Sequence, residues 1–184
     1  ANWNSPQSVT VTGVNDNVAD GNQVFMVNFN ALVSADLDYA GLIPTSLSVF
    51  NIDDDSAGFL VSRSSAPTTE NGGTTSFTIR LQSQPSADVI VNFVSDDTSE
   101  GTLTQNSLTF TSGNWNSDQT IIVTGQDDGL ADGDQLYRVV FSPAVSTDVD
   151  YSGLTASSVI IYNNDNDSAA IDVSAVSGPT TEAG

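Results

Sequence analysis

Residues 120–141 read TIIVTGQDDGLADGDQLYRVVF, a stretch in which two runs of alternating apolar residues enclose an acidic, glycine-rich segment. Apolar residues that alternate with period two are typical of strands with one buried face. Asp, Asn and Gly favour the tight turns between strands. The stretch therefore predicts two β-strands joined by an acidic loop. It recurs as residues 8–29, SVTVTGVNDNVADGNQVFMVNF, at an offset of 112 residues, the distance along the chain from Ser8 to Thr120.

The same offset relates the two ends of the chain. About half of the positions in residues 1–72 are identical to those in residues 113–184, without a gap. Self-similarity at a fixed period indicates an array of structural units. We interpret residues 1–55 as the C-terminal strands of one unit, 56–167 as a complete unit and 168–184 as the first strand of a third. This phase is the one expected of a piece of a longer tandem protein.

The complete unit contains about seven short apolar runs, and no window has the 3.6-residue period of an amphipathic helix. Thr, Val, Ile and Phe, which favour strands, dominate these runs. About seven strands in about 110 residues are typical of an all-β, immunoglobulin-like antiparallel β-sandwich. The expected strands are 59–61, 77–81, 89–94, 107–110, 120–124, 136–141 and 158–162, with counterparts at 8–12, 24–29 and 46–50 in the first unit.

The charge of the chain excludes several classes of function. The net charge is −20, and the only basic residues are Arg63, Arg80 and Arg138. Nothing in such a chain neutralises phosphate, so we expect no nucleic-acid binding. The chain has no His and no Cys, which excludes sites built on imidazole or thiolate. No apolar run approaches the roughly 20 residues of a membrane span, so we expect no membrane insertion.

Chain order predicts where the acidic segments lie. If each strand of the complete unit reverses direction, four segments meet at one end of the sandwich. They are the turn around Glu70, the turn at Asp96 and Asp97, the loop 127–134, and the exit segment 165–167. Carboxylates brought together repel one another unless a cation joins them.

The residue types in these segments favour a hard cation. Calcium accepts six to eight oxygens in flexible geometry, and oxygen ligands without His or Cys suit it. A loop with Asp127, Asp128, Asp132 and Asp134 can wrap such an ion. The alternative interpretation is that these residues only form turns. The convergence of four segments favours a calcium site.

The same residues resemble a known family, the Calx-beta domain. The segment 53–58, DDDSAG, is similar to the family's acidic exit segment followed by the next domain. Glu70 matches its glutamate before the second strand, and Asp127 and Asp128 match its paired aspartates. By this resemblance, the calcium ligands of the complete unit are Glu70, Asp97 or its neighbour Asp96, Asp127, Asp128, Asp132, Asp165, Asp167 and the carbonyl group of Leu130. In the first unit, Asp16, Asp20, Asp53, Asp54 and Asp55 form an incomplete counterpart.

We expect no enzymatic activity, because paired carboxylates are the only catalytic equipment in these residues and they are expected to bind metal. Calx-beta domains occur in large bacterial surface proteins and in sodium–calcium exchangers. We expect a secreted or cell-surface array whose units bind calcium and become rigid, with neighbouring repeats as partners. The truncated ends could also pair between molecules. Two alternatives remain open: an adhesin module that binds carbohydrate or protein, and an accessory domain of a large secreted enzyme.

Trp115 lies opposite the acidic end and discriminates between these alternatives. Its indole could stack on a sugar, but it could equally cap the core or pack on a neighbouring unit. Asp148, Asp150 and Tyr151 are expected in a solvated loop at that same end.

Overall fold

A computed structural model describes residues 3–180 and 182, so residues 1, 2, 181, 183 and 184 of the first and third expected units lie outside it. The described residues form strands and turns without a helix, and so contain no helix that could cross a membrane. The strands are β1 Gln23–Val27, β2 Leu47–Asn51, β3 Phe59–Val61, β4 Thr68–Thr69, β5 Thr74–Leu81, β6 Val89–Ser95, β7 Gly101–Leu103, β8 Ser107–Phe110, β9 Gln119–Gly125, β10 Gln135–Phe141 and β11 Val159–Asn164.

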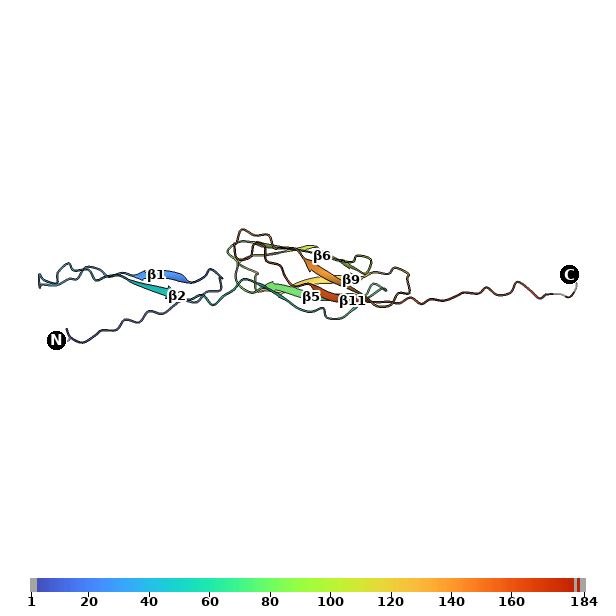
Figure 1. The fold of residues 1–184 in the computed structure, drawn as a ribbon, viewed down its shortest axis with the longest axis horizontal. Coiled ribbons are helices and arrows are strands. Elements are labelled where there is room, and N and C mark those ends of the chain that lie inside the picture. Colours follow the sequence, from blue (N-terminus) through green and yellow to red (C-terminus); the bar gives the residue numbers. More distant parts are fainter. Residues whose placement is uncertain (1–2, 181, 183–184) are drawn as a thin grey trace.

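Residues 59–164 form two sheets that face each other (Figure 1). The first sheet has the strand order β4-β11-β10-β6-β8, and the second has the order β3-β5-β9-β7. The pairs are antiparallel except β4 with β11, which is parallel. The chain therefore changes sheets between β3 and β4, and this change brings Thr68 and Thr69 beside the end of β11.

Alternation in the strands builds one core between the sheets. The inward residues of β5, β6, β9, β10 and β11 are almost fully buried, while their neighbours in sequence point outward. Phe141 packs edge-on against Phe77 and lies 5.6 Å from Phe93, measured between ring centroids. The core residues from the two sheets include Phe77, Ile79, Leu81, Val89, Val91, Phe93, Ile121, Val123, Tyr137, Val139, Phe141, Val159 and Ile161.

All seven expected strands of the complete unit are present, and the all-β prediction is confirmed. Two short strands were not expected, β4 and β7. They contain two and three residues and carry no apolar alternation that a sequence pattern could reveal.

Outside the sandwich, β1 and β2 form an isolated hairpin, laid end to end with it along the long axis (Figure 1). Its register repeats that of β10 and β11, since Gln23 opposes Asn51 as Gln135 opposes Asn163. The expected strand at 8–12 is wrong, because those residues are exposed coil. In the sandwich their counterpart β9 lies between β5 and β7, whereas residues 8–12 have no such neighbours.

The expected first strand of the third unit is also absent, since residues 168–180 are exposed and form no strand. Its counterpart β3 is held by antiparallel pairing with β5. A strand without a partner leaves its backbone groups to water and gains no pairing energy.

The end of the sandwich opposite the acidic loops differs from expectation. Tyr151 is buried, not solvated, and its hydroxyl group donates to the carbonyl oxygen of Ser83 at 2.7 Å. Asp148 is also buried, and its carboxylate accepts the N–H of Ser86 at 2.7 Å. Trp115 is half-buried and packs against the core. These side chains cover the end of the core that lies opposite the acidic loops.

The buried aromatic cluster should dominate the stability of the sandwich. Phe93→Ala should lower the free energy of unfolding by about 3–5 kcal/mol, because Phe93 is 0% exposed and its removal leaves a cavity. Ile122→Ala, on the outer face of β9, should cost less than about 1 kcal/mol. Urea unfolding followed by tryptophan fluorescence measures both, and equal losses would contradict this assignment of the core.

Candidate metal centre

Four distant segments bring carboxylates to one end of the sandwich. Glu70 follows β4, Glu100 precedes β7, the loop between β9 and β10 carries Asp128 and Asp132, and the segment after β11 carries Asp165 and Asp167. Two groups have carboxylate oxygens that all lie within 4.8 Å of one another: Glu70 with Asp165 and Asp167, and Glu100 with Asp128 and Asp132.

Parallel pairing of β4 with β11 positions the first group. The backbone N–H of Glu70 donates to the carbonyl oxygen of Asn164 at 3.2 Å. In return, the N–H of Asn166 donates to Oε2 of Glu70 at 2.9 Å. The Glu70 carboxylate consequently lies beside the exit segment. The residue as a whole is only 4% exposed.

Asp165 joins the exit segment to the loop between β9 and β10. Its carboxylate accepts the N–H of Gly133 at 2.7 Å and the N–H of Asp167 at 2.6 Å. Its own N–H donates to Oδ1 of Asp134 at 3.1 Å. Gly133 has a φ of 78°, in the left-handed region that glycine adopts without strain. The loop and the exit segment are thus held together by contacts in both directions.

The second group centres on Glu100, which the sequence interpretation missed. Glu100 is 6% exposed, and its Oε2 accepts a hydrogen bond of 3.2 Å from Nδ2 of Asn163. The next residue must be small, because a Cβ on Gly101 would overlap the ring of Tyr137. A sequence signal did exist: the chain has only three glutamates, and the other two, Glu70 and Glu182, occupy equivalent positions of the repeat.

Asp96 does not join the cluster. Its Oδ1 accepts the N–H of Arg138 at 2.6 Å, and its Oδ2 lies 3.6 Å from Nη1 of the same residue. Asp97 uses Oδ1 to accept the N–H and hydroxyl group of Ser99, which closes its own turn. These two hydrogen bonds hold the pKa of Asp97 below its ordinary value.

The remaining expected ligands lie in or beside the loop between β9 and β10. Asp127 lies close enough to raise the pKa of Asp167. The carboxylate of Asp128 accepts the N–H of Leu130 at 2.8 Å, and the carbonyl oxygen of Leu130 accepts the N–H of Asp132 at 3.0 Å. The Leu130 carbonyl is therefore engaged within the loop in this conformation.

Repulsion and burial act on these carboxyls together. Burial raises the pKa of Glu100, the Asn163 amide opposes this, and the charges of Asp128, Asp132 and Asp97 raise the pKa further. The Asn166 N–H lowers the pKa of Glu70, but burial and the neighbouring aspartates outweigh it and the pKa is raised. Burial and neighbouring aspartates also raise the pKa of Asp167.

No cation of the chain relieves this repulsion within the described residues. Their two ion pairs are Arg80 with Asp118 and Arg138 with Asp96. Oδ2 of Asp167 is buried without any hydrogen-bond partner. The acidic end therefore gathers carboxylate oxygens that no Arg side chain of the described residues pairs with, and one of these oxygens is buried without a hydrogen-bond partner.

The first unit repeats part of this arrangement. The carboxylate of Asp53 accepts the N–H of Gly21 at 2.7 Å and that of Asp55 at 2.9 Å, as Asp165 does with Gly133 and Asp167. A pocket in the same place is lined by Asp16, Asp20, Asp53, Asp54 and Asp55. The carboxylates of Asp53, Asp54 and Asp55 also meet within 4.8 Å.

A comparison with protein-family models finds no match, and a search of curated proteins finds none either.

The raised pKa of Glu100 predicts how the stability of the chain depends on pH when a chelator keeps metal ions away. A folded state that raises this pKa loses stability as pH increases from the ordinary value of 4.5 through the folded pKa. Glu100→Gln removes that charge and keeps an acceptor for Asn163. The variant should be more stable than the parent chain at pH 7, and the difference should vanish below pH 4.5.

Thermal melts at a series of pH values measure this difference. Asp88→Asn is the control for net charge, because Asp88 is exposed and immediately precedes β6, at the end of that strand away from the acidic loops. A Glu100→Gln chain that is less stable than the parent at pH 7 in chelator would contradict the expectation.

Proposed function

We propose that the acidic end of the sandwich binds calcium and that the chain belongs to a calcium-stiffened, Calx-beta-like array of repeats. The observation that carries this proposal is that two buried glutamates, Glu70 and Glu100, lie beside four aspartates. No Arg side chain of the described residues pairs with these carboxylates. Buried carboxylates are stable only when they are protonated, hydrogen-bonded or joined by a cation.

The chemistry of the donors favours calcium over other ions. All the side-chain donors are carboxylates, and the chain contains no His or Cys for softer metals. The loop between β9 and β10 has glycines at 129 and 133 with positive φ, so its backbone can curve around an ion. Calcium tolerates the irregular geometry of such a loop, whereas magnesium requires a near-ideal octahedron and retains its waters.

Two groups of three carboxylates share one end, and Asp128 links them. Asp128 raises the pKa of Glu70 and Asp167 in one group and of Glu100 in the other. In this proposal Glu70, Asp165 and Asp167 hold one ion and Glu100, Asp128 and Asp132 hold a second. The ions neutralise charges whose mutual repulsion opposes folding.

The mechanical consequence follows from the elements that the ions would join. The loop between β9 and β10 and the exit segment both contribute ligands, and the exit segment leads out of the unit. Fixing this exit limits the directions in which the next unit can lie. We propose that the array acts outside the cell, where calcium is abundant, and that it supports structure and does not catalyse.

Metal addition gives a direct test on the whole chain. Calcium at about a hundredfold excess over its dissociation constant should stabilise the chain by roughly 2.7 kcal/mol per ion, which corresponds to a rise of about 10 °C in melting temperature. Magnesium should have a smaller effect. Glu100→Gln should reduce the calcium response, whereas Asp88→Asn should retain it. Equal melting temperatures in calcium, magnesium and chelator would refute the proposal.

The junction between the hairpin and the sandwich has its own test. The N–H of Gln84 in the sandwich donates to the carbonyl oxygen of Asn17 at 2.6 Å, so the first acidic loop contacts the next unit. Calcium should slow amide exchange at residues 16–21 and 52–58. Asp53→Asn should abolish this protection and leave the calcium-dependent melt of the sandwich unchanged. Protection that survives in the variant would contradict a role for Asp53 at the junction.

A further inference from the structure

The outer face of the first sheet is apolar, although it does not contact the core. We call its residues Ile90, Val94, Leu136, Val140, Ile160 and Tyr162 the outer apolar face. They alternate with the buried residues of β6, β10 and β11. Cross-strand pairing joins them, since Leu136 opposes Tyr162 and Val140 opposes Val94. Ile160 and Tyr162 are 53% and 51% exposed.

The second sheet supplies an internal comparison. Its outward residues on β5 and β9 are mostly Thr and Ser, as expected for a sheet with one face in water. Among them Ile122 is apolar, and Leu60 is apolar on β3. The same chain thus makes one outer face polar and the other apolar. Exposed apolar side chains that cluster on one face of a sheet are typical of an interaction site.

Two polar residues share the outward side with these apolar residues, since Arg138 lies between Leu136 and Val140 on β10 and Asn92 lies between Ile90 and Val94 on β6. The chain carries 23 acidic residues, yet the strand residues of the outer apolar face include no carboxylate. The charged side chains at the face are Arg138 and its partner Asp96, both partly exposed. A surface with one cation beside one anion is complementary to a second copy of itself, turned by a two-fold rotation.

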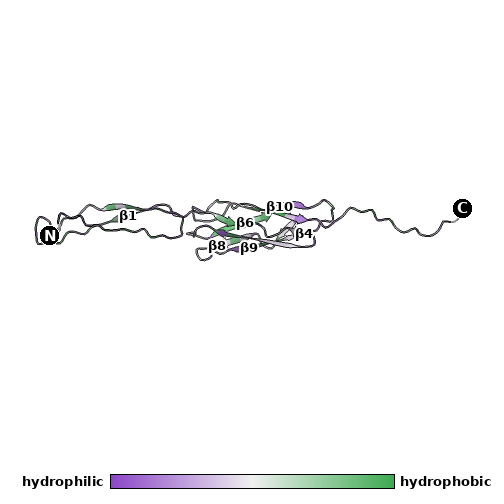
Figure 2. Ribbon diagram, turned by 90° about the horizontal axis from the view of Figure 1, so that it is seen from below, coloured by the Kyte–Doolittle hydropathy of each residue, from purple (hydrophilic) through white to green (hydrophobic). Residues whose placement is uncertain are grey.

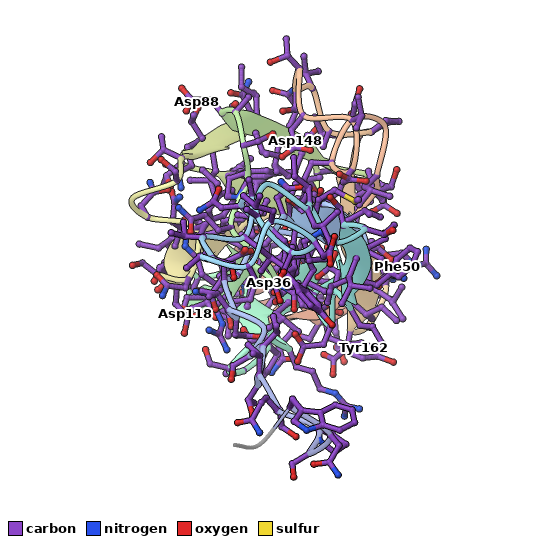
Figure 3. The ribbon with its side chains drawn as sticks, turned by 90° about the vertical axis from the view of Figure 1, so that its left-hand side faces the viewer. Asp36, Phe50, Asp88, Asp118, Asp148 and Tyr162 are labelled. Atoms are coloured by element: carbon purple, nitrogen blue, oxygen red, sulfur yellow. The ribbon has the colours of Figure 1, made fainter. Side chains whose placement is uncertain are left out.

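The hairpin carries a counterpart of this face. Val24 opposes Phe50 in the register in which Leu136 opposes Tyr162, and Val24 and Phe50 are both more than half exposed. Figure 3, a view along the long axis, shows Phe50 and Tyr162 on the same side of the molecule. Figure 2 shows apolar stretches, in green, on β1, β6 and β10. An apolar cross-strand pair is therefore present in both units, and the aromatic members of the two pairs lie on the same side of the molecule.

We propose that the outer apolar face binds the same face of a second copy of this chain, so that two copies associate side by side. In the complex, Tyr162 and Leu136 of each copy are covered by the apolar side chains of the other. Arg138 of each copy lies opposite Asp96 of the other copy, where the two ion pairs can exchange partners. This association goes beyond the proposed calcium site, because its residues lie on the sheet face and not in the acidic loops.

The size of the face limits the strength of one contact. Three strands spaced about 4.8 Å apart and about six residues long cover roughly 300 Å², so two copies bury roughly 600 Å² in total. Stable interfaces bury at least about 1,200 Å². A single pair of faces is therefore expected to associate weakly, and repetition of the face along an array would add contacts of the same kind.

Sedimentation equilibrium of the full chain in chelator tests the proposal apart from calcium binding. Between about 20 µM and 1 mM, the mean mass should rise from 19.2 kDa towards twice that value. Association should be tighter in about 0.5 M NaCl than at low salt, because salt screens the repulsion between two chains of net charge −20. Constant mass throughout this range at high salt would overturn the proposal.

Matched variants locate the contact. Tyr162→Glu and Leu136→Glu each place a charge on the outer apolar face and should weaken association at least tenfold. Thr120→Glu adds the same charge to the exposed outer face of the second sheet and should weaken association less than threefold. Unchanged melting temperatures will show that the variants fold. Equal effects of Tyr162→Glu and Thr120→Glu, or normal association of both Tyr162→Glu and Leu136→Glu, would also overturn the proposal.

Discussion

The buried side chain of Asn163 holds the acidic end of the sandwich together. Its Nδ2 donates to Oε2 of Glu100 at 3.2 Å and to the carbonyl oxygen of Gln126 at 2.9 Å, while its Oδ1 accepts the hydroxyl group of Thr68 at 3.0 Å. One neutral amide thus satisfies groups from three segments that are far apart in the chain. Gly125 permits this close approach, because a Cβ there would meet the Asn163 side chain and the Thr69 carbonyl oxygen.

Different interactions govern the stability of the acidic end and of the apolar body of the sandwich. The body gains its stability from burial of aromatic and aliphatic side chains between the sheets, which does not depend on charge. The acidic end instead gathers carboxylates, and burial and neighbouring aspartates raise the pKa of Glu100 and Asp167, whereas backbone N–H donors hold the pKa of Asp165 below its ordinary value. A ligand that neutralises them would therefore act mainly on the loops and the exit segment. Such a division suits a repeat whose body stays folded while its junctions change stiffness.

The two surfaces for which we propose roles follow from different features of the same strands. The ends of β9, β10 and β11 lead into the acidic loops, and the outward residues of β10 and β11 form the outer apolar face. Binding at the ends would order the units along the chain, whereas binding on the face would join chains side by side. Because the two surfaces share strands but no residues, each can be altered without removing the other.

The sequence by itself determined seven of the nine strands of residues 56–167, because period-two alternation directly reports which side of a strand is buried. It also determined that acidic loops gather at one end, since reversing strands bring alternate connections together. Only the tertiary structure decided which carboxylates meet. Asp96 turns to Arg138 on the neighbouring strand, while Glu100 turns inward to Asn163, a choice that depends on contacts between residues distant in the chain. The repeat likewise predicted strands at 8–12 and 168–184, but a strand requires a neighbour for its backbone hydrogen bonds, and only the assembled sheets show which segments have one.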